Sequence, residues 1–313
     1  MNPYLKLHRL EFSITYRCSA HCAHCQVEDA LRRSTPAAIG PALGAEIVHR
    51  VAQAYPLRSL MTFGGEPLLY PEAVCAIHQA AQEEGIAHRS IITNASVPRG
   101  EGAFRALARR LAACGVNAVL ISVDAFHQAC IPVEVVERNA RALVEAGIAE
   151  LAWNPCWVVS REHDNPWNRR TREVLDALSP LPVREDEGNV VQPDGHAREA
   201  LAAFLPAKVP LPAGSCGDMP YTGPLDAIEA IGVEPDGAIS ICHELSIGNA
   251  AQEDVLAILG RYDPYQIPEA RALLEGGVAA LVELAQERGV NLDPEGYYSV
   301  CDLCRSLRRQ MRG

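Results

Sequence analysis

The sequence predicts an α/β fold in which parallel strands alternate with helices. From residue 9 to about residue 190, short β-like runs alternate with longer amphipathic stretches. Such alternation implies a parallel sheet with right-handed crossovers. The runs are rich in Ile, Val and Leu on both faces, as expected for strands that helices cover on either side.

The elements follow one another in a regular order. The β-like runs are Leu10–Thr15, Arg58–Phe63, His88–Thr93, Ala118–Val123, Glu150–Val159 and Pro182–Val190. The helical patterns between them are Leu43–Ala54, Pro71–Glu84, Gly102–Ala113, Val133–Glu145 and Asn168–Leu178. Gly85, Gly115 and Gly147 each follow a helical pattern and are predicted to end those helices.

The composition changes after Val190. Residues 192–224 are rich in proline and glycine, which predicts an irregular segment. A hairpin is predicted next, with strands Ala230–Glu234 and Ala238–Cys242 around Pro235-Asp236-Gly237. The last seventy residues have helical patterns at Val255–Leu259, Pro268–Leu274 and Val278–Arg288. We therefore divide the chain into a larger domain, residues 1–195, and a C-terminal extension, residues 196–313.

Charge and hydropathy exclude several classes of protein. The formal net charge is −11, from 28 Lys and Arg against 39 Asp and Glu, which argues against an extended nucleic-acid surface. No apolar run reaches the roughly 18 to 20 residues that span a bilayer. The first nine residues have no uninterrupted apolar core, so no signal peptide is predicted. We expect a cytoplasmic protein with no membrane or nucleic-acid partner.

The cytoplasm keeps thiols reduced. The eleven cysteines of the chain therefore point to metal binding or catalysis before disulfides. Three of them, Cys18, Cys22 and Cys25, directly follow the first predicted strand with the spacing C-x3-C-x2-C. Three thiolates leave one iron of a four-iron cluster without a protein ligand, and an open position marks a catalytic metal. The alternative is a zinc site of Cys22, Cys25 and His21 or His24, which the x3 spacing does not favour.

This triplet resembles that of the radical S-adenosylmethionine (SAM) superfamily. Over residues 9 to 190 the resemblance implies a partial (β/α)6 TIM-like barrel, with SAM bound at the unligated iron of a [4Fe-4S] cluster. In that family an electron from the cluster cleaves SAM into methionine and a 5′-deoxyadenosyl radical, which removes a hydrogen atom from a substrate carbon. An electron donor of the flavodoxin or ferredoxin type is the partner expected for such an enzyme.

Three further strand ends support the resemblance. Gly64-Gly65-Glu66-Pro67, after the second strand, is similar to the family's GGEP motif. The glycines would let backbone groups approach the methionyl amine, and Glu66 would accept its hydrogen bonds. Thr93-Asn94 ends the third strand, and Ser122 and Asp124 share one face at the end of the fourth, a position that is similar to the family's ribose contact. The alternative for each of Thr93, Asn94, Ser122 and Asp124, taken singly, is an ordinary cap at the end of a strand.

A second set of cysteines lies near the C-terminus: Cys216, Cys242, Cys301 and Cys304. Gly237 and Cys242 match the G-x4-C of the SPASM and Twitch extensions of the family, which implies one auxiliary [4Fe-4S] cluster in a small C-terminal subdomain. A structural zinc site is the alternative, because C-x2-C pairs also serve zinc. Cys216 is the least secure ligand, since its distance in sequence from Cys242 is longer than usual.

The substrate is less constrained than the cofactor. Family resemblance favours a ribosomal peptide that is crosslinked, oxidised or epimerised. A dehydrogenase or cyclase of a small metabolite is the alternative enzyme, and an iron–sulfur electron-transfer or scaffold protein is the alternative without catalysis. Cys156, near the barrel mouth, is predicted to be a core residue rather than a hydrogen-atom donor. His127 is predicted to be a surface or packing residue rather than a catalyst.

Overall fold

The structure, a computed structural model, describes residues 2–34, 36–97, 101–218, 222–242 and 245–312. Its main sheet has nine strands in the order β11-β10-β9-β1-β2-β3-β4-β5-β7. The strands are β1 (Leu5–Thr15), β2 (Ser59–Gly64), β3 (His88–Thr93), β4 (Ala118–Ser122), β5 (Glu150–Asn154), β7 (Arg184–Glu185), β9 (Ile228–Val233), β10 (Ala238–Cys242) and β11 (Leu245–Asn249). Strands β1 to β5 and β7 are parallel neighbours, which confirms the predicted α/β class.

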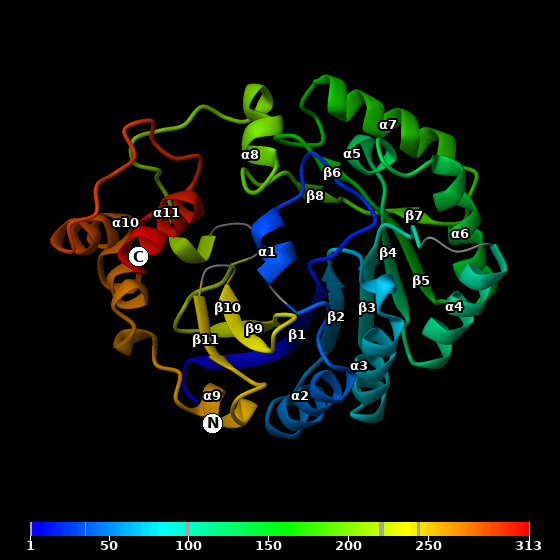
Figure 1. The fold of residues 1–313 in the computed structure, drawn as a ribbon, viewed down its shortest axis with the longest axis horizontal. Coiled ribbons are helices and arrows are strands. Elements are labelled where there is room, and N and C mark those ends of the chain that lie inside the picture. The colour runs from blue at the N-terminus through cyan, green and yellow to red at the C-terminus, as the bar shows by residue number, and fades with distance from the viewer. Residues whose placement is uncertain (1, 35, 98–100, 219–221, 243–244, 313) are drawn as a thin grey trace.

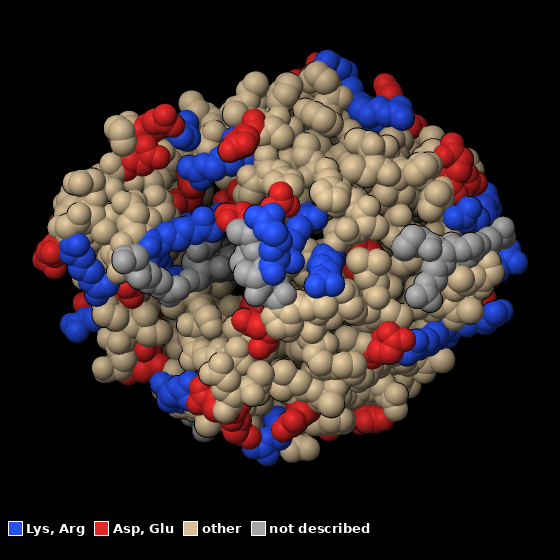
Figure 2. Space-filling view, in the orientation of Figure 1, with Lys and Arg blue, Asp and Glu red and all other residues tan. Residues whose placement is uncertain are grey.

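Helices lie on the outer side of these parallel strands (Figure 1). They are α2 (Pro41–Ala54), α3 (Pro71–Glu83), α4 (Glu101–Ala113), α6 (Val133–Glu145) and α7 (Pro166–Leu178). Gly85, Gly115 and Gly147 follow α3, α4 and α6 with φ of 72°, 96° and 79°, which confirms that they end these helices. Acidic and basic side chains are interspersed over the face in Figure 2, and basic atoms gather over α1 (Asp29–Ser34), which carries Arg32 and Arg33.

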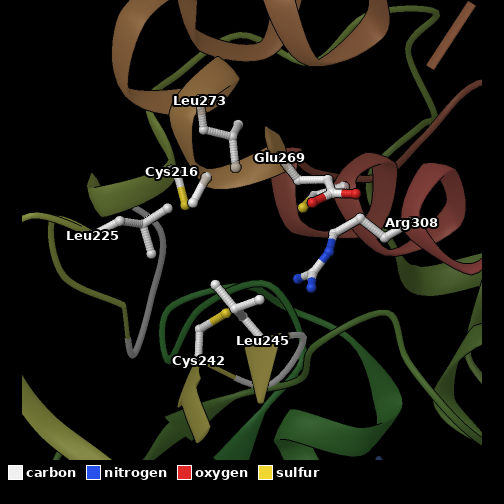
Figure 3. Close-up of a pocket in the computed structure, with 9 residues that line it drawn as sticks. Cys216, Leu225, Cys242, Leu245, Glu269, Leu273 and Arg308 are labelled. Carbon is white, nitrogen blue, oxygen red and sulfur yellow. The ribbon is translucent and has the colours of Figure 1, made fainter. Parts of the chain in front are cut away.

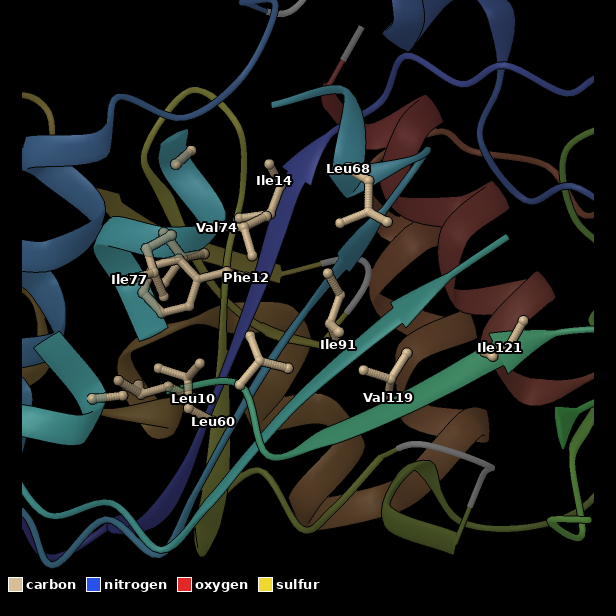
Figure 4. Close-up of a cluster of buried hydrophobic side chains, with 14 of the residues drawn as sticks. Leu10, Phe12, Ile14, Leu60, Leu68, Val74, Ile77, Ile91, Val119 and Ile121 are labelled. Carbon is tan, nitrogen blue, oxygen red and sulfur yellow. The ribbon is translucent and has the colours of Figure 1, made fainter. Parts of the chain in front are cut away.

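The core lies between the sheet and the helices. Leu10, Phe12 and Ile14 are two residues apart in β1, so they share one face of the strand, and they pack with Val74 and Ile77 of α3 (Figure 4). All five are completely buried. At about 1.5–3 kcal/mol for each fully buried aliphatic or aromatic side chain, this face anchors the strand that leads to Cys18.

Two predicted strands are each broken into two pieces. The run Glu150–Val159 ends as β5 at Asn154, and Pro155 separates it from β6 (Cys156–Trp157). The run Pro182–Val190 becomes β7 and β8 (Asn189–Val190), and β6 and β8 form a separate two-stranded parallel sheet. Proline has no N–H for the ladder, so the strand cannot continue unbroken through Pro155.

The predicted hairpin is confirmed, but its position was not foreseen. Strands β9 and β10 pair antiparallel around Gly237, whose φ is 87°. Strand β9 also pairs parallel with β1, with Leu10 opposite Ile231 and Phe12 opposite Val233. The hairpin therefore extends the sheet of the predicted larger domain. The division at residue 195 stays a prediction.

The C-terminal helices are α9 (Val255–Gly260), α10 (Pro268–Glu287) and α11 (Val300–Arg312). Gly277 has φ 64° and ψ −151° inside α10, which accounts for the two helical patterns predicted there. Short helical turns complete the chain: α5 (Ala125–Gln128), α8 (Ala197–Ala200), η1 (Pro67–Leu69), η2 (Ala202–Phe204), η3 (Cys216–Asp218) and η4 (Pro264–Gln266). Within the described residues, no helix has the length and apolarity that crossing a membrane requires.

Candidate active site

The cysteine triplet lies in the loop that follows β1, at the carboxyl end of the parallel strands. Cys22 is buried, and Cys18 and Cys25 are half-buried. Burial raises the pKa of the Cys18 and Cys22 thiols, so an unligated thiolate is disfavoured there. Hydrogen-bond donors already face the sulfur atoms. Asn94 Nδ2 lies 3.5 Å from Cys18 Sγ, and Arg32 Nη2 lies 3.2 Å from Cys25 Sγ.

Gly64 and Gly65 bring the turn after β2 against the backbone that leads into the triplet. Gly65 N–H donates to Thr15 O over 2.6 Å, and Glu66 N–H donates to Arg17 O over 2.8 Å. A Cβ atom on Gly65 would lie 2.1 Å from Arg17 O, and one on Gly64 would lie 2.4 Å from Thr15 O. Gly64 also has φ 125°, which favours glycine. The two glycines therefore fix the triplet loop on the GGEP turn.

The Glu66 carboxylate is buried between the ends of β2 and β3. Its Oε1 accepts from Thr93 Oγ1 over 2.7 Å and from Leu68 N–H over 2.9 Å, and its Oε2 accepts from Asn94 N–H over 2.8 Å. Burial raises the pKa of Glu66 to about 7, and the three hydrogen bonds offset this only in part. Pro67, which is also buried, begins the 3-10 turn η1 after it. The carboxylate thus joins two strand ends.

Asn94 connects this network to the triplet. Its backbone N–H binds Glu66, while its side chain reaches Cys18 Sγ and, over 3.4 Å, Ser19 Oγ. Asn94 Oδ1 also accepts from Ser96 N–H over 2.8 Å, in the manner of a turn-forming asparagine. Asn94 therefore both stabilises the turn after β3 and contacts the loop that carries the cysteine triplet.

Asp124 is completely buried at the end of β4. It is the N-cap of α5, where Oδ1 accepts from Phe126 N–H and His127 N–H, each over 2.9 Å. Oδ2 accepts from Cys156 N–H over 3.0 Å, and His127 Nδ1 lies 2.9 Å from both carboxylate oxygens. Burial alone would raise the pKa of Asp124, but His127 outweighs it and holds the pKa at about 2. Ser122 is buried two residues earlier, opposite Asn154 of β5.

His127, which the sequence predicts to be a surface or packing residue, lies beside the triplet in the structure. Its ring lies 4.9 Å from that of His24, and ligand atoms of Cys22, His24 and His127 all lie within 4.8 Å of one another. His24 also packs on Phe126, with ring centroids 4.6 Å apart. Burial lowers the pKa of His24 to about 4, so this ring is neutral. The one available signal was the position of His127 three residues after a capping aspartate.

Three of the four C-terminal cysteines line one cavity. Cys216, Cys242 and Cys304 share it with Glu269 and Arg308, and the other lining residues are apolar: Leu225, Leu245, Ala270 and Leu273. In Figure 3, Cys216 and Cys242 lie on opposite sides, and Arg308 reaches in from α11. Burial, and after it the Cys242 thiol, raise the pKa of Cys216 to about 11, and Arg308 opposes this rise. Cys301 is half-buried one turn before Cys304 on α11 and does not line the cavity.

Comparison with known proteins decides the family. The model of the radical SAM superfamily matches residues 12–169, just over half of the 313 residues, and this match contains the triplet, the GGEP turn and Asp124. The chain belongs to the radical SAM superfamily. It is therefore an enzyme of that superfamily, and SAM and a [4Fe-4S] cluster are the cofactors that membership implies.

Two solved structures share this fold at low sequence identity, and a third is similar at a lower score. Native anSMEcpe with bound AdoMet is 13% identical, with a TM-score of 0.52 over 90% of this chain and 86% of that chain. The polyhistidine-tagged form of anSMEcpe with bound AdoMet is 14% identical, with a TM-score of 0.53 over 87% and 81%. BtrN in complex with AdoMet and 2-DOIA is 15% identical, with a lower TM-score of 0.49 over 96% and 92%. The search of curated proteins found no match.

The residues after β1 fit the cluster of a radical SAM enzyme. Two sulfur atoms bound to one zinc ion at about 2.3 Å would stand about 3.8 Å apart. The sulfur atoms of Cys18, Cys22 and Cys25 do not all lie within 4.8 Å of one another, which suits a multi-iron cluster better than one ion. Of the zinc ligands considered above, the structure brings Cys22 and His24 within 4.8 Å of each other, and His127 rather than Cys25 completes that group.

Proposed function

We propose that this enzyme reductively cleaves SAM at a [4Fe-4S] cluster held by Cys18, Cys22 and Cys25. When bound, the cluster supplies the electron that divides SAM into methionine and a 5′-deoxyadenosyl radical. The observation that carries the proposal is the geometry of the triplet: three sulfur atoms after β1, with Asn94 and Arg32 donating to two of them. An electron donor of the flavodoxin or ferredoxin type remains the proposed partner.

The chain's own residues hold and shield the cofactors in this proposal. Asn94 and Arg32 orient the thiolates through hydrogen bonds, and Arg32 offsets part of their negative charge. Gly64, Gly65, Glu66 and Pro67 shape the wall beside the triplet, while Thr93, Asn94, Ser122 and Asp124 form the next strand ends that SAM would meet. Three donors of the chain already occupy Glu66, so we assign the methionyl amine to the GGEP backbone as well as to this carboxylate.

The first experiment is anaerobic reconstitution followed by dithionite and SAM. The wild type is expected to release 5′-deoxyadenosine, measured by chromatography and mass spectrometry. A Cys18/Cys22/Cys25 triple-alanine variant is expected to release none. Cys130→Ala is the matched control, because Cys130 is exposed and lies outside both cysteine sets. A wild type that binds iron but leaves SAM intact would instead favour an electron-transfer or scaffold protein.

We further propose an auxiliary [4Fe-4S] cluster in the C-terminal cavity, with Cys216, Cys242 and Cys304 as ligands and Cys301 as the fourth. Support comes from the shared cavity and from the i, i+3 spacing of Cys301 and Cys304 on α11. A zinc ion held by the same cysteines is the alternative. Iron counting tests this: about eight irons per chain in the wild type and about four in the triple-alanine variant.

For the substrate, we propose a ribosomal peptide that is crosslinked, oxidised or epimerised. The similarity of Gly237 and Cys242 to the SPASM and Twitch pattern supports this class. The test is incubation of the reconstituted enzyme with a short peptide encoded beside its gene, followed by mass spectrometry and chiral amino-acid analysis. An unchanged peptide, together with turnover of a small sugar or cofactor precursor, would move the assignment to a dehydrogenase or cyclase of small metabolites.

A further inference from the structure

Arg308 carries a buried positive charge that the described part of the chain does not neutralise. Only 5% of the Arg308 surface is exposed to solvent. Nε and Nη2 are both buried without a hydrogen-bond partner. The carboxylate that shares its cavity, Glu269, is already paired with Arg288, with 3.0 Å between Oε1 and Nη1. A guanidinium stays ionised in proteins, so Arg308 cannot avoid this cost by losing a proton.

Burial of an unpaired charge is strongly unfavourable, so an anion is expected at this place. The neighbouring side chains indicate which anion. Arg308 follows Cys304 by four residues on α11, so both side chains lie on the same face of the helix. Figure 3 shows the guanidinium directed into the space between Cys216 and Cys242. Thiolates that bind a metal group there would form an anion beside the unpartnered Nε and Nη2 of Arg308.

We propose that Arg308 is the charge partner of the metal group in the C-terminal cavity, donating hydrogen bonds from Nε and Nη2 to its sulfur atoms. This inference rests on the proposed auxiliary site. It makes Arg308 a positioning residue, which orients and neutralises the group that the cysteines hold. Hydrogen bonds and charge next to cluster sulfurs raise the reduction potential, because the reduced state is more negative. The cavity is therefore built for an anionic, thiolate-bound group.

The test uses the full chain with Cys18, Cys22 and Cys25 replaced by alanine, so that the C-terminal cysteines hold the remaining iron. Arg308→Met removes the charge at similar length, and Arg308→Lys keeps it. Arg309→Met is the matched control, because Arg309 is the next residue, is 59% exposed and pairs with Glu28. The readouts are iron loss to a chelator, the midpoint potential from EPR, and the melting temperature with and without metal.

Arg308→Met is expected to lose iron about tenfold faster or more and to shift the potential downward. Arg308→Lys, which keeps the charge but not both donors, is expected to lie between Arg308→Met and the parent, and Arg309→Met stays close to the parent. In the metal-free proteins, the substitution is expected to stabilise the fold instead. Arg308→Met is expected to melt at a higher temperature than the parent, because an unpaired buried charge has gone. An arginine with a merely packing role would lower the melting temperature in both states, and that result would overturn the proposal.

Failure of the auxiliary cluster itself is a separate outcome. If the parent binds zinc in place of iron, the cluster assignment is wrong, and the role of Arg308 is read from the rate of zinc release with the same three variants. If the parent retains neither metal, both the auxiliary site and the role of Arg308 are refuted. Should Arg308→Met fail to fold, Arg308→Gln, which also removes the charge but keeps a polar side chain, takes its place in the same comparisons with the parent and with Arg309→Met.

Discussion

Thr93 Oγ1 donates a hydrogen bond of 2.7 Å to Glu66 Oε1, and this contact joins the ends of two neighbouring parallel strands. Thr93 Oγ1 also accepts from Ala95 N–H over 2.9 Å. Ala95 has φ 53°, and its carbonyl accepts from Asn139 Nδ2 over 2.7 Å. The edge of the site is therefore a continuous network of buried hydrogen bonds, and Asn94, within it, contacts Cys18.

Glu66 makes the stability of the enzyme depend on pH. Burial raises its pKa from the ordinary 4.5 to about 7 in the folded chain, so the unfolded chain releases this proton first as pH rises. The contribution of Glu66 is therefore fully present below pH of about 4.5 and decreases up to pH of about 7, by as much as about 3 kcal/mol. Glu66→Gln removes this dependence.

Anaerobic urea unfolding of both proteins from pH 5 to 8 measures the effect. The unfolding free energy of the wild type minus that of Glu66→Gln should fall across this range and become flat above pH of about 7. Other titrating groups cancel in the difference, since both proteins contain them. A difference that stays constant with pH would show that Glu66 ionises normally.

Gly65→Ala should damage the triplet loop. The added Cβ would lie 2.1 Å from Arg17 O, which is backbone and cannot rotate away. We expect a loss of about 1–3 kcal/mol in unfolding free energy, together with reduced iron at the triplet. Gly102→Ala is the control, because nothing lies within 4 Å of its Cβ position in α4, and a gain of about 0.5–1 kcal/mol is expected. Equal effects of the two substitutions would contradict this packing role.

Arg32 should set the reduction potential of the SAM-binding cluster. Its Nη2 lies 3.2 Å from Cys25 Sγ, and its side chain is 11% exposed. A hydrogen bond from a charged donor contributes about 1.5–3 kcal/mol, and about 1.4 kcal/mol corresponds to about 59 mV for one electron. Arg32→Met should therefore lower the midpoint potential by up to roughly 65–130 mV. EPR-monitored titration checks this, with the exposed neighbour Arg33→Met as control; identical potentials in the two variants would exclude the role.

Single alanine substitutions should separate the two cysteine sets. Cys216→Ala, Cys242→Ala and Cys304→Ala each remove a thiol from the same cavity, so each should lower the iron count from about eight to about four per chain. Cleavage of SAM without substrate should persist in these variants, because the triplet is intact. Cys75→Ala, at a buried cysteine of α3 outside both sets, should leave the count unchanged. Retention of all iron in Cys216→Ala would remove that residue from the ligand set.

The sequence predicted the barrel strands and helices well where apolar periodicity is strong. His88–Thr93 and Val133–Glu145 have the predicted bounds in the structure. Strand β1 begins five residues earlier than predicted, at Leu5, because Leu5 and Leu7 are buried between polar neighbours and give a weaker signal. The parallel pairing of β1 with β9 was not predictable, since periodicity identifies a strand without identifying its partner.

The sequence likewise predicted some residues of the candidate site and not others. Spacing alone indicated Cys18, Cys22 and Cys25, because cluster ligands follow a fixed pattern close together in sequence. The proximity of His127 to His24 depends on where Asp124 begins the short helix α5, which is a tertiary feature. The same reason applies to Cys216, which was the least secure member of the predicted set because of its long distance in sequence from Cys242, although both line one cavity.

The parallel pairing of β1 with β9 has a consequence for biosynthesis. The ribosome releases β1 first, yet its outer edge acquires a partner only after residues 228–233 have been made. Throughout that interval an apolar strand with unpaired N–H and C=O groups is open to other chains. We expect the nascent enzyme to need a chaperone until β9 emerges, and a gene shortened before residue 228 to give insoluble product.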